Sequence, residues 1–593
     1  MASPGAKYLL NLLPKLLLPA LLVHYLCWFV QDSLPLLRYS AVRAVLYLCA
    51  GPLYLYARFV WTRALAARRA HKLGATFFPV HQGKWPGGVD FVLDTMRTLD
   101  SEYIADRLLT LTKEHGPTFT ISFMGEEAIF TTEPHYIKQI LATNFPNYVK
   151  GKERFGDATS SVLGSGVFNS DGDMWKFHRT MARPFFTRER VREFDIFARH
   201  ADEVIQKMKD SFNDGTPVDM QDVMARFTLD SASEFLFGSC VNSILEPFGT
   251  PGERAPRAES SNTHPTPVAF SRAFTNAQFL ISRRTRMGHV WKLWEIPRDE
   301  SHKFVVDIDR FLDPITEAAL SRRRDMVELL AGSKVSGEIE NDMTFLDHMV
   351  TQTQDPKIIR DSLMNMLIAG RDTTASNLTF VVYMLSQHPA VLSRLRDDIL
   401  HVVGPVKVPT YDDIRNLQYL RAVINETLRL FPPVPLNVRD TINEDVWVGE
   451  DGKRYYIGPN MSTSYSVLIM HRNPAYWGED ALEFDPDRWI DDRLHKLTEN
   501  PFAFLPFNAG PRICLGQQFA YNEVSFMIIR LLQSFSSVEL RPDAQPKGCL
   551  PSLDWLPHGR NLVEKIWPRA HLTLYVAGGL WLTMGEANVA GDA

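Results

Sequence analysis

The chain has 593 residues, with 64 Lys and Arg against 69 Asp and Glu, so its formal net charge is −5. Hydrophobic residues make up 45% and charged residues 22%, which is globular usage and excludes a disordered or collagen-like chain. This charge gives no basis for nucleic-acid binding, so we expect no nucleic-acid partner. Five cysteines without a C-x-x-C pair favour neither a disulfide framework nor zinc. A cysteine with a role is therefore expected to act alone.

Two apolar runs, 8–30 and 41–61, open the chain. Each is long enough to cross a hydrocarbon core, which needs roughly 20 residues. Arg63, Arg68 and Arg69 follow the second run, and such a basic cluster is typical of the cytoplasmic side. A cleaved signal peptide is disfavoured because no small-x-small cleavage site follows the first run. We predict that residues 1–72 form a membrane anchor and a basic stop-transfer segment.

The number of crossings stays open, because aromatic residues in this region also suit one crossing plus a segment lying in the interface. We therefore predict one or two N-terminal transmembrane helices, in contact with membrane lipid. The rest of the chain has no comparable apolar run and is expected to be cytoplasmic.

The pattern from residue 89 onward is mainly helical, with short β segments at 118–123 and 128–131. Helical periodicity is clear over 194–212, 220–237, 304–324, 358–387 and 390–403. Residues 249–267, rich in Pro, Ser and Thr, predict a surface insertion, and residues 545–564 look like a second insertion without a functional account. The motifs described below span 175–514 and must meet at one site. We therefore predict a single large domain, 73–593, mainly α with a small β lobe.

The most specific pattern is F-x-x-G-x-R-x-C-x-G, formed by Phe507, Gly510, Arg512, Cys514 and Gly516 just before a helical pattern at 517–535. A thiolate at a helix N-terminus is stabilised by the dipole and the free N–H groups. The glycines permit tight turns around the sulfur, Phe507 can shield it from water, and Arg512 offers a cation to an anionic ligand. The alternative is a buried structural cysteine, the commonest fate of a lone one.

This pattern resembles the haem-thiolate signature of the cytochrome P450 superfamily, with every fixed position matched. The resemblance implies the P450 fold, a helical bundle plus a small β-rich lobe with haem b between distal and proximal helices. It implies that Cys514 is the axial iron ligand, with Phe507, Arg512 and Gly516 beside the haem. Thiolate ligation pushes electron density onto iron and favours O–O cleavage, which is monooxygenase chemistry.

Glu426 and Arg429 lie three residues apart in the predicted helix 417–430 and so face the same side. An exposed pair of this kind contributes only about 0.2–0.5 kcal/mol. The resemblance implies a third member, Arg488, from the F-x-P-x-R segment at 484–488. A desolvated Glu with two Arg is costly to break, so we predict a buried network with a folding role.

The segment from Ala369 to Thr374, A-G-R-D-T-T, lies midway along the longest helical pattern. Glycine costs about 1 kcal/mol inside a helix, and Asp and Thr compete for backbone hydrogen bonds. The segment thus predicts a locally loosened helix with a groove for dioxygen and a polar relay, or else a helix boundary. The resemblance implies that Thr373 supports oxygen at the haem and that Asp372 relays protons.

Trp175 and Arg179 match a W-x-x-x-R helix, and Arg439 follows nine residues after the predicted helix 417–430. By itself, Trp and Arg at this spacing is an ordinary helix pair. The resemblance implies that these three residues bind the haem propionates, for which the planar guanidinium fork is suited. His178 either assists or lies on the surface.

Apolar residues are expected to wall the substrate site, although plain core is an equal alternative for each of them. Met366 and Ala369 share a helix face with Thr373, and the other predicted wall residues are Val434, Leu436, Val438 and Leu580. Closer resemblance is to fungal microsomal alkane and fatty-acid hydroxylases, which implies long-chain alkanes or fatty acids as substrates. Animal fatty-acid ω-hydroxylases often carry Glu where Ala369 stands, so we expect non-covalent haem.

Three alternatives remain: a broad xenobiotic or polycyclic aromatic hydroxylase, a haem-thiolate isomerase or dehydratase, and a haem sensor without turnover. Isomerases of this type usually lack the Asp-Thr pair present here as Asp372 and Thr373.

Electrons must come from another protein, because only 79 residues follow Cys514 and no nucleotide-binding fingerprint is present. The resemblance implies NADPH–cytochrome P450 reductase as partner, with cytochrome b5 as a further candidate donor. It also implies location in the endoplasmic reticulum membrane.

Overall fold

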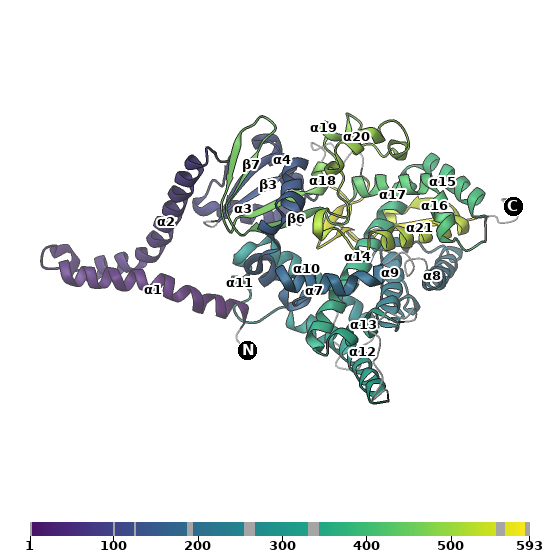
Figure 1. The fold of residues 1–593 in the computed structure, drawn as a ribbon, viewed down its shortest axis with the longest axis horizontal. Coiled ribbons are helices and arrows are strands. Elements are labelled where there is room, and N and C mark those ends of the chain that lie inside the picture. Colours follow the sequence, from purple (N-terminus) through teal and green to yellow (C-terminus); the bar gives the residue numbers. More distant parts are fainter. Residues whose placement is uncertain are drawn as a thin grey trace.

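The computed structural model describes residues 3–98, 101–123, 126–186, 194–253, 267–329, 343–552 and 564–587. Most of the predicted insertion at 249–267 and the central part of that at 545–564 lie outside these ranges. A helical body, a β-rich lobe and an N-terminal helical hairpin make up the fold (Figure 1). The expected mainly α architecture with a small β lobe is confirmed.

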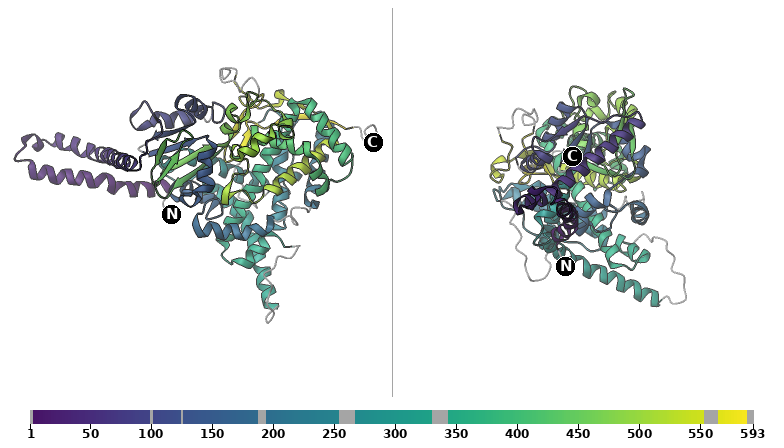
Figure 2. Two further views of the ribbon diagram at one scale, coloured as in Figure 1. Left: turned by 45° about the horizontal axis from the view of Figure 1, so that its top comes forward. Right: turned by 90° about the vertical axis from the view of Figure 1, so that its left-hand side faces the viewer.

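The N-terminal hairpin consists of α1 (Pro4–Val30), a short turn with η1 (Pro35–Arg38), and α2 (Ser40–Lys72). At 27 and 33 residues the two helices are about 40 and 50 Å long. Both are long and apolar enough to cross a membrane, and most of their side chains are exposed. They project together from one side of the molecule, with the turn at the far end (Figures 1 and 2). These features indicate membrane anchoring.

The β lobe is built on a six-stranded sheet of order β1-β2-β3-β9-β6-β4. Strands β2 and β3 pair antiparallel, with Thr118 opposite Thr131, and β3 pairs parallel with β9. Helices α3 (Val89–Thr98) and α4 (Asp106–His115) contact β2. The strands of this lobe are β1 (Val80–Gln82), β2 (Thr118–Phe123), β3 (Glu126–Thr131), β4 (Tyr148–Val149), β6 (Leu436–Thr441) and β9 (Ser462–Ser466), with the separate hairpin β7 (Asp445–Val448) and β8 (Arg454–Ile457).

The helical body surrounds α14 (Pro356–Gln387), which is almost entirely buried. Asp355 caps this helix by accepting a hydrogen bond from the Lys357 N–H. The helix ends at Gln387 because His388 precedes Pro389, and a residue before proline disfavours helical backbone. The other long helices are α7 (Gly172–Ala182), α8 (Asp195–Asn213), α9 (Met220–Phe237), α10 (Pro267–Arg286), α12 (His302–Leu329), α13 (Phe345–Gln352), α15 (Pro389–Val402), α17 (Gln418–Leu430) and α21 (Gln517–Ser534). Shorter ones are α5 (Pro134–Lys138), α6 (Asp157–Leu163), α11 (Trp291–Trp294), α16 (Tyr411–Asn416), α18 (Val467–Met470), α19 (Pro474–Trp477) and α20 (Leu494–Glu499).

Two hydrophobic clusters meet along α14, which contributes to both of them. One joins it to α8, α9, α15, α17 and α21, and the other joins it to α6, α9, α10, α12 and α13. Near the C-terminus, β10 (Phe535–Leu540), β13 (Trp581–Glu586) and β5 (Val218–Asp219) form a three-stranded sheet. A hairpin of β11 (Pro568–Ala570) and β12 (Leu574–Val576) also packs beside α14. The central helix thus connects most of the segments that carry the sequence motifs.

Candidate active site

The cysteine loop is folded by its own backbone and by two neighbours. The Cys514 N–H donates to the Phe507 carbonyl at 3.0 Å. Gly510 has φ +69°, and a Cβ there would overlap the Leu141 carbonyl, so the loop requires glycine. Asn508 also has positive φ, 64°, and its side-chain oxygen accepts from the Tyr465 hydroxyl at 2.9 Å. These contacts place Cys514 just before α21.

The Cys514 side chain is exposed on the isolated chain, yet it is surrounded by enough protein for burial to raise the pKa of its thiol. The cysteine is thus accessible although protein atoms surround it closely. The Gly516 N–H and the charge of Arg179 lower its pKa, as predicted for this helix start, but burial outweighs them. A metal bound to the sulfur would reverse this balance, because a coordinating thiol is deprotonated.

The middle of α14 is a second candidate part of the site. Residues 361–385 are buried except for Ala369, Gly370 and Thr373, which share one helix face. The cluster containing the preceding turn of α14 also packs against Leu515, the neighbour of Cys514. The middle of α14 therefore carries a partly exposed patch on an otherwise buried helix, and its preceding turn belongs to the cluster on which Leu515 packs.

The prediction of a locally loosened helix at this patch is wrong. The helix α14 is continuous through Gly370, and the Thr373 hydroxyl donates to the Ala369 carbonyl at 2.7 Å. Packing on all other sides holds the helix together, and the hydroxyl satisfies its own hydrogen bond locally.

Asp372 lies on another face of α14 and is buried. One carboxylate oxygen pairs with Arg371 at 2.9 Å, and the other has no hydrogen-bond partner among the described residues, although Gln278 of α10 lies nearby. Burial raises the pKa of Asp372, while Arg371 opposes the shift. Burial thus favours the neutral form of this carboxyl more than it is favoured in an exposed aspartate.

A third part of the site is a strongly cationic wall. Arg439 is buried, and burial together with Arg439 lowers the pKa of Arg512 to about 10. Burial and the same two arginines hold the pKa of Lys150 well below its usual range. Asp171 is the one acidic group that acts on Lys150 among the described residues. A ligand carrying negative charge would offset the repulsion among these cations.

The excess of positive charge leaves one atom of Arg512 without a hydrogen-bond acceptor among the described residues. Its Nη2 pairs with Asp171 at 2.6 Å and donates to the Ser170 carbonyl at 2.9 Å, whereas its Nε is buried without a partner among the described residues. The guanidinium lies 4.6 Å from the centroid of the Trp175 ring. Arg179 donates to the Ile513 carbonyl at 3.0 Å, beside the cysteine. Unmatched cations next to an accessible thiol fit a haem with two propionates.

His178, for which a surface position was an alternative, is buried instead. Its Nδ1 lies 3.1 Å from the Ser362 hydroxyl of α14. It joins α7 to α14 and makes no contact with Arg179 among the described interactions. Lys150 and Asp171 were missed by the sequence reasoning, because a single lysine and a single aspartate carry no local signal.

The predicted Glu426 network is assembled in full. Arg429 binds both oxygens of Glu426 at 2.8 Å, and Arg488 approaches it at 3.5 Å. The Trp489 indole also donates to Glu426 at 3.0 Å, and the Arg429 guanidinium reaches the carbonyls of His471, Ala481 and Glu483. Every polar atom of the network has a partner, so it holds α17 to the segment around η10 (Pro486–Trp489).

The predicted substrate wall is placed only in part. Ala369 and three residues around β6, Val434, Leu436 and Val438, are partly exposed, whereas Met366 is mostly buried. The placement of Leu580 is wrong: its side chain is 1% exposed and packs in the core near the start of α9, so it offers no surface to a ligand. Leu572, in the turn between β11 and β12, is partly exposed and packs on the cluster that contains Met366.

These features define the class: a mainly helical protein with an accessible cysteine, a long buried central helix and a cationic wall. The chain belongs to the cytochrome P450 family, whose profile matches residues 92–558. It is 35% identical to cytochrome P450 52A9 of Candida maltosa, over 77% of this chain and 85% of that protein. It is 34% identical to cytochrome P450 52-M1 of Starmerella bombicola, over 82% and 89% of the two chains. The protein is therefore a cytochrome P450 monooxygenase, and its cofactor is haem with an axial cysteine thiolate.

Proposed function

We propose that the protein hydroxylates long-chain alkanes or fatty acids, with Cys514 as the haem ligand. The observation that carries this proposal is the pairing of an exposed Cys514 with the open patch Ala369, Gly370 and Thr373 on a helix buried elsewhere. Haem bound there supplies oxygen activation, to which the thiolate contributes electron density.

Residues of the chain would bind the propionates, supply protons and exclude water. Arg439, Arg512 and Lys150 bind and orient the propionates, and Trp175 supports the Arg512 guanidinium. Thr373 carries a hydroxyl proton at the open patch, held by the Ala369 carbonyl. Asp372, paired with Arg371, accepts and returns protons behind it. Phe507 and the apolar wall limit the access of water.

An apolar substrate follows from the wall residues, because Ala369, Leu572, Val434, Leu436 and Val438 carry no charge. A membrane anchor suits substrates that dissolve in lipid. The resemblance of the motifs to fungal alkane and fatty-acid hydroxylases supports the same choice of substrate class.

We assign residues 1–72 to a two-crossing anchor and 73–593 to the catalytic domain, on the cytoplasmic side of the endoplasmic reticulum membrane. Support comes from the start of α1, where the Gly5 N–H donates to the Glu295 carbonyl at 3.2 Å and Ser3 binds the Ile296 carbonyl. Because α2 also ends against the domain, with Arg69 3.6 Å from Glu444, both ends of the hairpin lie on one side. A glycosylation acceptor placed at 31–39 should be modified, and an unmodified one contradicts two crossings.

The function is tested with the full-length protein and an NADPH–cytochrome P450 reductase. The reduced CO complex should show the red-shifted band of thiolate-bound haem, and Cys514→Ser should lose it. Dodecane and lauric acid should give hydroxylated products that require NADPH and O2. Turnover of polycyclic aromatics alone would contradict the proposed substrate class while leaving the haem assignment intact.

A further inference from the structure

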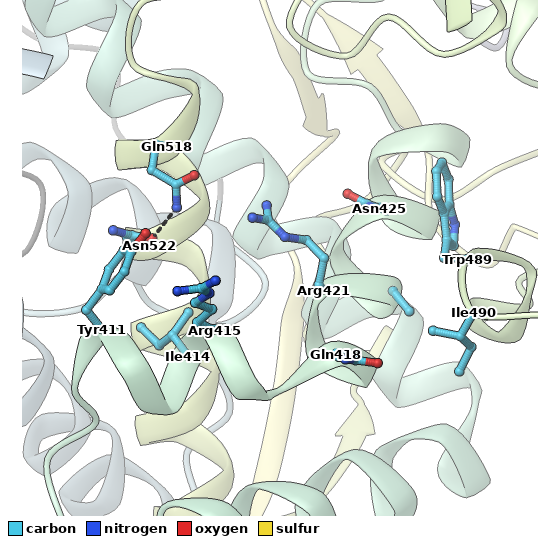
Figure 3. Close-up of a pocket in the computed structure, with 11 residues that line it drawn as sticks. Tyr411, Ile414, Arg415, Gln418, Arg421, Asn425, Trp489, Ile490, Gln518 and Asn522 are labelled. Carbon is cyan, nitrogen blue, oxygen red and sulfur yellow. Dashed lines mark hydrogen bonds between the residues drawn. The ribbon is translucent and has the colours of Figure 1, made fainter. Parts of the chain in front are cut away.

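A second hollow lies outside the haem site, on the surface between α16, α17, α21 and η10. Its volume is about 420 Å³, and its lining comes from these four elements (Figure 3). None of the residues assigned to haem or substrate lines it. Yet α21 begins three residues after Cys514, so one wall of this hollow is the helix that follows the thiolate loop.

The charge of the hollow is one-sided. Arg415 and Arg421 line it, and none of its 11 lining residues is acidic. Neither arginine forms an ion pair with any of the residues that the structure describes. The helix α16 carries two carboxylates, Asp412 and Asp413, and among the described residues neither pairs with Arg415; Asp413 is bound to Lys407 at 2.9 Å and to the N-cap Thr410. Two guanidinium groups therefore face the hollow without a counter-ion.

Arg421 is held in a defined orientation. Its guanidinium lies 3.5 Å from the centroid of the Tyr521 ring, and the Tyr521 hydroxyl donates to Asn425 at 2.7 Å. Figure 3 shows the Arg421 side chain extending from α17 toward α21. A guanidinium stacked on a ring keeps the N–H groups of its edge available, and this edge binds carboxylate or phosphate in its plane.

The remaining lining is amide and apolar. Gln418 and Gln518 bring side-chain N–H groups, and Ile414 and Trp489 bring apolar surface. The volume lies in the range of small-molecule sites, which combine apolar walls with a few polar anchors. The occupant that matches this lining has an anionic head and a flat or short apolar body.

We propose that this hollow binds a small oxyanion, a carboxylate or a phosphate monoester carried on a ring or short apolar body. The site goes beyond the proposed hydroxylation and does not depend on it. Tyr521 connects it to the thiolate loop, because its ring lies 5.1 Å from that of Phe507, whose carbonyl accepts the Cys514 N–H. Occupation is therefore expected to shift the Soret band of the bound haem.

The test uses the full-length holoenzyme in detergent, with the haem iron blocked by an imidazole ligand so that the substrate site does not contribute. Phenyl phosphate, benzoate and inorganic phosphate are titrated by calorimetry, with benzyl alcohol as the uncharged probe. The two aromatic anions should bind and benzyl alcohol should not. The titration with inorganic phosphate shows whether an anionic group binds without an attached ring.

The variants R415Q and R421Q should each weaken binding about tenfold, since a hydrogen bond to a charged group contributes that much. The matched control is R324Q, an exposed arginine on α12, which should bind as the wild type does. R421K keeps the charge without the fork and should fall between R421Q and wild type, which separates recognition from loss of folding.

Equal binding of benzyl alcohol, or equal weakening by R324Q, overturns the proposal. So does unchanged anion binding in the double variant R415Q/R421Q. If no anion binds but the double variant raises the KM for the reductase, the hollow is a protein-docking feature, and the small-ligand assignment is wrong. The calorimetric outcomes do not depend on hydroxylase activity, so they stand apart from the proposed hydroxylation.

Discussion

Asp171 binds Arg512 and the segment that carries Lys150 at the same time. Its Oδ1 pairs with Arg512 Nη2 at 2.6 Å, and its two oxygens accept the backbone N–H groups of Lys150 and Gly151 at 2.9 and 3.2 Å. One carboxylate thus aligns two cations that come from segments about 360 residues apart in the chain. It cannot neutralise both, and the unpartnered Nε of Arg512 marks where further negative charge fits.

Arg512→Gln should therefore weaken haem retention. Loss of a buried charged donor costs about 1.5–3 kcal/mol, so haem should transfer to apomyoglobin roughly 10- to 100-fold faster. Arg512→Lys keeps the charge but not the fork and should be intermediate. Lys176→Gln, an exposed change on α7, is the control. Wild-type haem transfer from Arg512→Gln would contradict the assigned contact.

Glu426→Ala should destabilise the fold by about 3–5 kcal/mol, because it leaves Arg429 and Arg488 buried without their carboxylate. Denaturant unfolding followed by haem absorbance measures the change. Glu499→Ala, from the exposed pair with His495, should cost at most about 1 kcal/mol. A similar small loss at Glu426 would show that the network is not structural.

Thr373→Ala should uncouple oxygen use from product formation. Removal of the hydroxyl at the open patch of α14 takes away a positioned proton donor, and such groups contribute about 10²–10⁴-fold. Product formed per O2 consumed should fall at least about tenfold, with peroxide released instead. Thr373→Ser should recover most of the coupling, and unchanged coupling in Thr373→Ala would remove its assigned role.

His471 should make the fold sensitive to acid. Burial and, next, Arg429 lower the pKa of His471 to about 3, and its Nε2 accepts the Leu505 N–H at 2.9 Å. The unfolded chain therefore binds a proton that the folded chain excludes, so stability is present above pH 6.5 and is lost as the pH falls toward 3.

The slope from one such group is at most about 1.4 kcal/mol per pH unit. His471→Gln keeps an acceptor without a titrating proton and should flatten the acid side of the stability curve, measured by unfolding between pH 7.5 and pH 4.5. His495→Gln, which is exposed, should leave the curve unchanged. An unaltered slope in His471→Gln would assign the acid sensitivity to other groups.

Leu572 and Leu580 form a matched pair for the substrate wall. Leu572→Ala should shift the positions at which dodecane is hydroxylated, because Leu572 packs on the cluster that contains the proposed wall residue Met366. Leu580→Ala should cost about 2–5 kcal/mol of stability through a core cavity, with the same product ratio as wild type. Gas chromatography of the products measures the positions of hydroxylation. A change in these positions in Leu580→Ala but not in Leu572→Ala would contradict both assignments.

The motif-bearing helices were predicted well because their signals are local. The pattern over 358–387 became α14 (Pro356–Gln387), and that over 220–237 became α9 with the same bounds, since apolar periodicity fixes which face is buried. Glu426 and Arg429 were placed together by their spacing on one helix turn. The cysteine loop was identified by residues within ten positions of one another.

Tertiary structure alone decided the rest, because contacts across hundreds of residues leave no local pattern. Lys150 and Asp171 meet Arg512 only after the β lobe packs on the helical body. Leu572 packs on the cluster that contains Met366, whereas Leu580 is buried in the other cluster, with the C-terminal half of α14. The helix at Gly370 stays unbroken because surrounding side chains outweigh its weak local propensity. The sequence by itself determined the kind of chemistry and the cysteine on which it depends. Packing determined which charges and walls surround that cysteine, since burial and pairing exist only in the folded chain.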